Sequence, residues 1–451
     1  MMQFELTKEI IREIKENIAN QQQKVILDSL KDIHPADIAD IMDELNFEEA
    51  IFIFKILDKE KKADVLTELD DDSREKVLNA LSSKEIAEEI DDLETDDAAD
   101  IIAELTDQKK EEVISQIEDT EHAKDIVDLL RYPEDTAGGL MGKELVKVNE
   151  DWSMLRCVKE MREQAQEIDV VHTVYVVDKD NVLKGILSLK SMLTTSTKTP
   201  VKEIYRSNII SVKTNEKDEE VAKIMQKYDL IVVPVVDELG HLVGKITIDD
   251  IVDVIKEEAD RDYQMAAGIS EDVEADDTIF KLTKARLPWL LIGMLGGLGA
   301  ATIITHFQDG LQQYLALVTF IPLIQATAGN VGVQSAAIMV QGIANNSLNN
   351  EIVKRLLKEL TLGLVNGVAL ATIFLIIGLL LFQIDLTIAL TIGFALSTVI
   401  ILAAIIGTFI PLFLHKRGID PAVATGPFIT TSNDVFGILI YFVIAKLILG
   451  F

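Results

Sequence analysis

The chain has little cysteine and few basic residues relative to acidic ones. Among its 451 residues, Cys157 is the single cysteine, so no intrachain disulfide can form and nothing indicates an oxidising compartment. Lys and Arg number 43 against 75 Asp and Glu, which gives a formal net charge of −32. Because this acidic excess repels phosphates, a nucleic-acid-binding protein is excluded. The first residues contain no apolar run of signal-peptide length, so we expect the amino end in the cytosol.

The charge is unevenly distributed along the chain. Residues 1–280 hold 34 basic and 69 acidic residues, a net charge of −35, whereas residues 281–451 hold 9 and 6, a net charge of +3. Hydrophobic residues nevertheless make up 48% of the whole. The pattern predicts an acidic, polar portion followed by an apolar one.

Five apolar runs after Leu287 reach the roughly 20 residues that a bilayer core requires. We expect membrane spans near 286–307, 313–343, 355–382, 386–414 and 423–449. Lys and Arg occur before the first span and in the second and fourth connections, and they are absent from the first and third. The positive-inside bias therefore places residues 1–285 in the cytoplasm of a cell-membrane protein and the carboxyl end outside.

Asp434 is the acidic residue that the pattern places well inside a span. Its stretch, GPFITTSNDVFGILIYF, has no Lys, Arg or His within ten residues of the carboxylate. An unpaired carboxylate at membrane depth is costly, so it faces water, a cation or a partner. A cation pathway is one interpretation, and a protonated or hydrogen-bonded packing residue is the other.

The second span contains IPLIQATAGNVGVQSAA, in which Pro322, Gly329 and Gly332 are expected to break the helix and free carbonyl oxygens. A close helix–helix contact is the alternative reading of these glycines. Together with the polar residues of span five, the break predicts an all-oxygen lining suited to Mg²⁺ or Ca²⁺. That lining comprises Asn330, Gln334, Thr430, Thr431, Ser432, Asn433 and Asp434.

The acidic portion begins with an array of repeats. Leucines recur every twelve residues from Leu45 to Leu105, followed by Ile117 and Leu129. Each unit has an acidic or Ser/Asp start and apolar positions at helical spacing. Since twelve residues allow two turns of helix and a connection, neighbouring helices must stack to bury their faces. The pattern predicts a superhelix of short helices.

A second duplication follows, in which VYVVDKDNVLKGILSLKSML from Val174 matches VPVVDELGHLVGKITIDDIV from Val233. Each copy predicts a strand, a turn, a second strand and a helix. The pattern resembles a tandem pair of cystathionine-β-synthase (CBS) domains, which implies a cleft that often binds ATP or another adenine nucleotide. Thr247 and Asp250 fit the family's ribose-binding pattern, whereas Ser191 departs from it in the first copy. The candidate nucleotide-binding residues are Tyr175, Ser191, Thr247 and Asp250.

An acidic helical segment connects this pair to the first span. Its carboxylates crowd about four helical turns, and like charges at that spacing repel unless a cation screens them. A solvated charged face is the alternative interpretation. The carboxylates are those of Asp249, Asp250, Asp253, Glu257, Glu258, Asp260 and Asp262.

The order of these parts, with EDTAGGLM at 134–141 and P-x₆-GN-x-G-x-Q in span two, resembles the MgtE family of magnesium transporters along nearly the whole chain. The resemblance implies a multidomain membrane protein with an α-helical superhelical repeat domain, an α/β CBS pair, a connecting helix and a five-helix all-α transmembrane domain. The expected limits are 1–133 for the acidic repeat domain, 134–200 and 201–258 for the CBS domains, 259–284 for the connecting (plug) helix and 285–451 for the membrane domain.

The resemblance also implies a Mg²⁺-selective homodimeric channel, gated by cytosolic Mg²⁺ and closed when internal Mg²⁺ is high. It assigns the pore to Asp434, Asn330, Thr430, Gly426 and Gln334. It implies metal binding at Asp64, Asp96, Asp100, Asp218, Glu219, Asp229, Asp250, Asp253, Glu258, Asp262, Asp420 and Asp434. Departures are Arg261 and Lys217, where relatives can have an acid, and Gly426, where they can have Asn.

Two other interpretations remain open. The cargo can be another divalent cation such as Co²⁺, Mn²⁺ or Ca²⁺, while an anion fits poorly with a buried carboxylate. Alternatively, the chain is a membrane-anchored CBS sensor that transports nothing. An enzyme is not predicted, because the sequence offers no metal-ligand cluster, nucleophile–base pair or phosphate loop.

Overall fold

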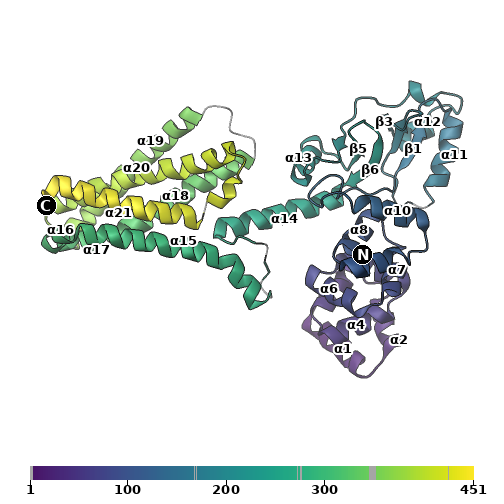
Figure 1. Ribbon diagram of the computed structural model, residues 1–451, viewed down its shortest axis with the longest axis horizontal. Coiled ribbons are helices and arrows are strands. Elements are labelled where there is room, and N and C mark those ends of the chain that lie inside the picture. Colours follow the sequence, from purple (N-terminus) through teal and green to yellow (C-terminus); the bar gives the residue numbers. More distant parts are fainter. Residues whose placement is uncertain are drawn as a thin grey trace. The chain divides into compact units, whose positions relative to one another are not determined.

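The computed structural model describes residues 4–166, 168, 170–271, 273–274, 277–344, 352–424 and 426–451. The chain forms two compact units, Met1–Ile255 and Lys256–Phe451, which are described separately. Figure 1 shows helices alone at the amino end of the first unit, strands in its later part, and long helices in the second.

The amino-terminal part consists of short helices. They are α1 (Lys8–Ala19), α2 (Gln23–Leu30), α3 (Pro35–Asp43), α4 (Phe47–Ile56), α5 (Lys59–Glu68), α6 (Asp71–Ala80), α7 (Ser83–Ile90), α8 (Thr95–Ala103), α9 (Asp107–Ile114) and α10 (Thr120–Leu129). From α3 to α9 each helix begins twelve residues after the previous one. The repeating leucines from Leu57 to Leu129, with Ile117, are buried, and Leu45 packs against them. The predicted repeat array is confirmed.

Polar caps define where the repeated helices start. Asn46 and Ser82 form capping boxes with the Glu three residues later, and the carboxylates of Asp58 and Asp70 accept backbone N–H bonds in the same position. Contacts run between alternate helices, such as α3 with α5 and α5 with α7. The stacking therefore buries apolar faces that no single two-turn helix buries alone.

The later part of the first unit holds two three-stranded sheets of the same design. Each has a parallel pair followed by an antiparallel one, in the order β1-β2-β3 and β4-β5-β6. The register repeats as well, because Val176 lies opposite Gly185 and Val235 lies opposite Gly244. The elements are β1 (Val146–Asn149), α11 (Met154–Gln164), β2 (Val174–Val177), β3 (Leu183–Leu187), α12 (Leu189–Thr194), η1 (Val201–Glu203), β4 (Val212–Lys213), α13 (Asp218–Tyr228), β5 (Val232–Val236) and β6 (Leu242–Thr247).

The connecting helix has different bounds from those expected. Instead of spanning 259–284, α14 runs over Ile248–Ala267, directly after β6, and buries Ile251 and Val254. It stops where Gly268 adopts a φ of +82°, a left-handed conformation that ends helices. The next helix, α15, begins at Ile279.

The second unit contains the apolar helices. These are α15 (Ile279–His306), α16 (Gln308–Gln313), α17 (Leu315–Thr319), α18 (Ile321–Ala344), α19 (Ile352–Leu380), α20 (Leu386–Lys416), η2 (Pro421–Ala424) and α21 (Pro427–Leu449). Among the described residues, five segments are long and apolar enough to cross a membrane, and each overlaps a predicted span. The fold class expected from the sequence is confirmed.

The prediction of a helix break at Gly329 and Gly332 inside span two is wrong. α18 continues through Gly329 and Gly332, and the helix is interrupted earlier, between α17 and α18, with Pro322 at the start of α18. The glycines instead allow close packing. A Cβ at Gly332 would lie 1.8 Å from Asn433 Nδ2, and one at Gly407 would lie 2.3 Å from the Gly332 carbonyl oxygen. The alternative reading, a close helix–helix contact, therefore describes this segment, and no carbonyls are freed there.

Candidate cation sites

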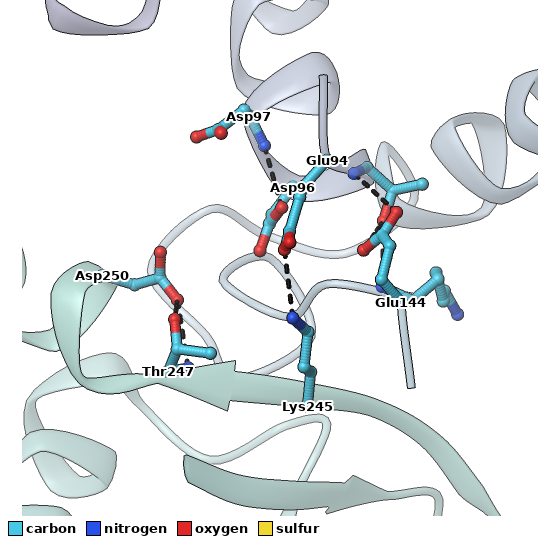
Figure 2. Close-up of polar contacts among 9 residues, drawn as sticks. Glu94, Asp96, Asp97, Glu144, Lys245, Thr247 and Asp250 are labelled. Atoms are coloured by element: carbon cyan, nitrogen blue, oxygen red, sulfur yellow. Dashed lines mark hydrogen bonds and ion pairs between the residues drawn. The ribbon is translucent and has the colours of Figure 1, made fainter. Parts of the chain in front are cut away.

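An acidic cluster lies where the helical repeats meet the second CBS sheet (Figure 2). Asp96 and Asp97 lie in the first turn of α8, and Asp100 follows one turn later on the same helix. Glu144 comes from the segment before β1, and Asp250 from the first turn of α14. Asp96, Asp100 and Asp250, which the sequence analysis named as sensor positions, lie in this one cluster. The charge of Asp250 acts on both Asp96 and Asp100 across the join.

The pKa values of these carboxyl groups are raised. Burial raises the pKa of Asp96 well above its ordinary value, and the charge of Asp250 adds to the shift. Partial burial among the surrounding groups and the charges of neighbouring carboxylates raise the pKa values of Asp97 and Asp100 to about 7, although both residues are exposed to solvent. Burial also raises the pKa of Asp250, and hydrogen bonds from Thr247 oppose that shift. Cations that neutralise these groups are therefore favoured there.

Three carboxylates within this cluster are close enough to share one ion. One carboxylate oxygen from each of Glu94, Asp96 and Glu144 lies within 4.8 Å of the other two. Among the described residues, this is the group of three acidic, His or Cys side chains close enough to hold a metal ion. The sequence prediction missed Glu94 and Glu144. The signal was available for Glu94, because it stands at the repeat position that Asn, Asp or Ser occupies in α4 to α7. Glu144, in an irregular segment, had no such signal.

The other predicted sensor residues of the first unit lie on its surface. Asp64 is exposed on α5, and Asp253 is exposed on α14. Asp229 ends α13 in the left-handed conformation. Asp218 and Glu219 begin α13, where Glu219 accepts a bond from Lys223 at 2.7 Å. Lys217, one of the departures, pairs with Asp135.

The predicted residues at the amino end of the second unit are partly engaged. Glu258 forms an ion pair with Arg261, so this departure from the family pattern neutralises a predicted ligand. Asp262 is exposed on α14. Asp420 is also exposed, and its carboxylate accepts the Ala422 N–H at 2.8 Å, which caps η2.

The candidate nucleotide residues occupy two environments. Tyr175 is 2% exposed, its hydroxyl has no partner among the described residues, and it lines a small cavity with His172 and Lys245. Thr247 donates its hydroxyl to Asp250 at 2.7 Å. In the first copy the corresponding bond joins the hydroxyls of Ser188 and Ser191 at 2.8 Å, without a carboxylate.

In the membrane unit, α18 and α21 pack side by side. Thr430 lies against Gly329, and the buried Asn433 lies against Gly332. Asp434 follows Asn433 directly and is half-buried, while Asn330 and Gln334 are exposed on α18. The structure thus brings the predicted oxygen ligands of spans two and five onto neighbouring helices.

Gly426 lies beside the end of α14. A Cβ at Gly426 would approach the Ala266 carbonyl oxygen to 2.3 Å, and one at Gly268 would approach Pro427 Cγ to 2.4 Å. Both close approaches require glycine. The end of the connecting helix is therefore packed against the start of α21.

A second membrane carboxyl group was not predicted. Glu359 on α19 is 4% exposed and accepts a hydrogen bond from Ser335 Oγ of α18 at 3.3 Å. Ionisable groups inside a span require a partner, and this hydroxyl is one.

These features define a class of membrane proteins in which an acidic helical-repeat domain and a CBS pair precede a domain of membrane-spanning helices. Family models match the three parts separately: an MgtE intracellular N domain at 33–135, CBS domains at 137–197 and 201–257, and an MgtE divalent cation transporter at 321–444.

Full-length relatives agree with these matches. The magnesium transporter MgtE of Bacillus subtilis is 31% identical over 92% of this chain and 95% of its own length. The magnesium transporter MgtE of Thermus thermophilus is 31% identical over 97% of this chain and 98% of its own length. The chain belongs to the MgtE family.

A solved structure supports the fold of the first unit. The cytosolic domain of the Mg²⁺ channel MgtE in complex with ATP is 33% identical, covers 54% of this chain and 99% of its own, and has a TM-score of 0.51. The resemblance predicted from the sequence is confirmed at the level of family and fold.

Proposed function

We propose that this protein is a channel-type transporter that carries Mg²⁺ down its electrochemical gradient into the cytosol. The observation that supports the proposal is the packing of α18 against α21, in which Thr430 lies against Gly329 and Asn433, the residue before Asp434, lies against Gly332. Relatives that share nearly its whole length are magnesium transporters. Carboxylate and amide oxygens suit a Mg²⁺ ion that keeps several of its waters.

In this proposal the pore is completed by a second copy of the chain. Exposed polar side chains on an apolar helix are costly in lipid, so Asn330 and Gln334 are expected to face a polar path between copies. A homodimer would bring two Asp434 carboxylates to one axis. Thr430 and Gly426 would lie near the same path, Thr430 with its hydroxyl bonded to the Gly426 carbonyl oxygen at 3.2 Å.

Closure of the pore is proposed to follow cytosolic Mg²⁺. At low Mg²⁺ the acidic domains repel one another, and at millimolar Mg²⁺ weak carboxylate sites fill and bring them together. Sites proposed to contribute are Asp64, Asp96, Asp100, Asp218, Glu219, Asp229, Asp250, Asp253, Glu258, Asp262 and Asp420. The contact of Ala266 with Gly426 supports α14 as the element that reaches the pore helix.

The CBS cleft is proposed to take ATP or another adenine nucleotide. A relative's cytosolic domain has been solved in complex with ATP. The unpaired, buried hydroxyl of Tyr175 beside a cavity supports a ligand there, and Thr247 with Asp250 fits a ribose. Ser191 leaves the first copy without the matching carboxylate.

The proposed location is the cell membrane, with the first unit in the cytosol and the carboxyl end outside. The distribution of Lys and Arg among the connections supports this orientation.

Flux into proteoliposomes tests the proposal. Wild type should take up Mg²⁺ when the face bearing the acidic domains is at low Mg²⁺ and stop at millimolar Mg²⁺. Asp434→Asn should reduce the uptake by at least about tenfold, because a neutral amide stabilises a divalent ion less well than a carboxylate. Asp309→Asn, at an exposed position on α16, serves as the control and should keep the wild-type flux.

Two results would redirect the proposal. Absence of wild-type flux under both conditions would favour a CBS sensor that transports nothing. Equal flux of Mg²⁺ and Co²⁺ in competition would replace a Mg²⁺-selective path by a general divalent one.

A further inference from the structure

Lys245 is a buried lysine in β6. The residue is 5% exposed, and its backbone N–H and carbonyl both pair with those of Gly142 at 2.9 Å. Its backbone is thus fixed between the second CBS sheet and the segment that leads from the helical repeats into the first CBS domain. A lysine with so little exposure requires a compensating negative partner.

That partner belongs to the helical-repeat domain. Lys245 Nζ lies 3.0 Å from Glu94 Oε2, immediately before α8 (Figure 2). In the repeat, Glu94 holds the N-cap position, but its side chain makes no capping bond. The earlier caps at this position are Asn46, Asp58, Asp70 and Ser82. Because a glutamate replaces a short cap here, its carboxylate is available to the lysine.

The capping bond of α8 comes from the CBS side instead. Glu144 accepts the Thr95 N–H at 2.9 Å and the Thr95 hydroxyl at 3.1 Å. Each glutamate therefore bonds to the opposite domain: Glu94 of the repeat domain pairs with Lys245, and Glu144 of the CBS side bonds to Thr95. With Asp96 they form the group of three carboxylates, and the charges of all three raise the pKa of Lys245 while burial opposes them.

The position of the ammonium has an electrostatic consequence. A divalent ion held by Glu94, Asp96 and Glu144 would lie within a few ångströms of Lys245 Nζ, where two positive charges repel strongly. The lysine and a metal ion thus compete for the same carboxylates. Without the lysine, the three partly buried carboxylates would repel one another and favour another cation.

We propose that Lys245 is the resident cation of this carboxylate group, so that the repeat domain stays joined to the second CBS domain without a metal ion at Glu94, Asp96 and Glu144. The inference rests on the proposed function in one respect, which is that Mg²⁺ binds the remaining acidic sites. It assigns closure to those other sites and removes Asp96 from the proposed set of Mg²⁺ ligands.

Limited trypsin digestion of the full chain in detergent tests the inference. The exposed Arg131 follows α10, at the start of the segment that joins the two domains, so cleavage after it reports their separation. In EDTA, Lys245→Met should be cleaved there at least about tenfold faster than wild type, because the three neighbouring carboxylates of the join have lost the cation that offsets their repulsion. Millimolar Mg²⁺ should return the variant to the wild-type rate, since a divalent ion then replaces the ammonium.

Matched variants separate this role from simple packing. Lys245→Arg keeps the charge and should resemble wild type in EDTA. Lys143→Met removes a second lysine of the same region, whose ammonium lies 2.8 Å from Asp128, and Mg²⁺ should not correct its defect. The double variant Lys245→Met, Glu94→Gln should regain protection in EDTA, because fewer negative charges remain.

Wild-type cleavage rates for Lys245→Met in EDTA would overturn the inference, and so would fast cleavage that Mg²⁺ does not slow. The assay needs no transport. A chain that shows this pattern but no Mg²⁺ flux would therefore keep the resident lysine and lose the proposed function.

Discussion

Glu359 is a carboxyl group in a membrane helix whose burial depends on tertiary packing. Glu359 falls within the span predicted near 355–382, but it directly follows the basic residues Lys354, Arg355 and Lys358, so the local pattern does not indicate that it is buried. Its burial and its bond to Ser335 depend on how α19 packs against α18. Sequence alone located Asp434, which has no other charged residue within ten positions, but not a carboxyl group whose neighbours are charged.

Asp43 offers a test of burial at the residue scale. Burial raises its pKa to about 6; a hydrogen bond with Ser73 opposes the shift and the charges of Asp70 and Asp40 add to it. Because the folded state binds this proton more tightly than the unfolded state, the contribution to stability is full below pH 3.8 and is lost as pH rises to about 6.

Asp43→Asn should therefore raise the thermal midpoint of the full chain above pH 6 and flatten its pH dependence below that value. The gain should stay under about 1 kcal/mol, because Asp43 is exposed and solvent screens its charge. Circular dichroism melts from about pH 4 to about pH 8 are the measurement, because the contribution is lost between the unfolded and the folded pKa. Asp28→Asn removes the same charge from an exposed site, and an equal gain there would indicate a net-charge effect instead.

At the scale of elements, α18 shows why glycine patterns are ambiguous. The same residues, Gly329 and Gly332, fit a broken helix or a close crossing, and the outcome depends on what approaches them. Here Asn433 of α21 packs onto Gly332 on one side, and Gly407 of α20 on another. Whether these glycines break the helix or allow a close crossing therefore depends on Gly407 and Asn433, which are distant in the sequence and lie outside the local pattern.

Gly407→Ala should destabilise this crossing, because the new Cβ would lie 2.3 Å from a backbone oxygen that cannot move alone. Overpacking of this kind costs about 1–3 kcal/mol. The thermal midpoint in detergent should fall and Mg²⁺ flux should decline. Gly297→Ala is the matched control, since a Cβ there meets no atom within 4 Å among the described residues. Equal effects of both substitutions would contradict the crossing.

Regular elements were predictable where local chemistry repeats. The twelve-residue period located the helices from α3 to α9. The duplication, whose two copies are offset by 59 residues, located the matching strands. The acidic cluster was predictable only in part. Asp96, Asp100 and Asp250 follow the family pattern, whereas Glu94, Glu144 and Lys245 become neighbours through the join of two domains.

For the whole molecule, the separation of charge is the dominant property. Residues 1–280 carry a net charge of −35, and a proposed dimer brings two such portions near one another. Simple salt screens this repulsion over a Debye length of about 10 Å at 0.1 M. Carboxylate sites add binding of divalent ions, which screening does not provide.

Small-angle X-ray scattering from the full chain in detergent should therefore show a smaller radius of gyration in MgCl₂ than in KCl of equal ionic strength. KCl alone should give only part of the contraction, because it screens without bridging carboxylates. If both salts contract the particle equally, diffuse repulsion and not a set of sites controls its shape.

The twelve-residue step of the amino-terminal helices also constrains how the gene can change in length. Because each helix from α3 to α9 starts twelve residues after the last, loss or duplication of one whole unit leaves every later leucine facing the core. An insertion within a helix that is far from a whole number of turns, such as two residues, rotates the following leucine by about 200° and out of the core. Length variants that survive selection should therefore differ from this chain by whole units.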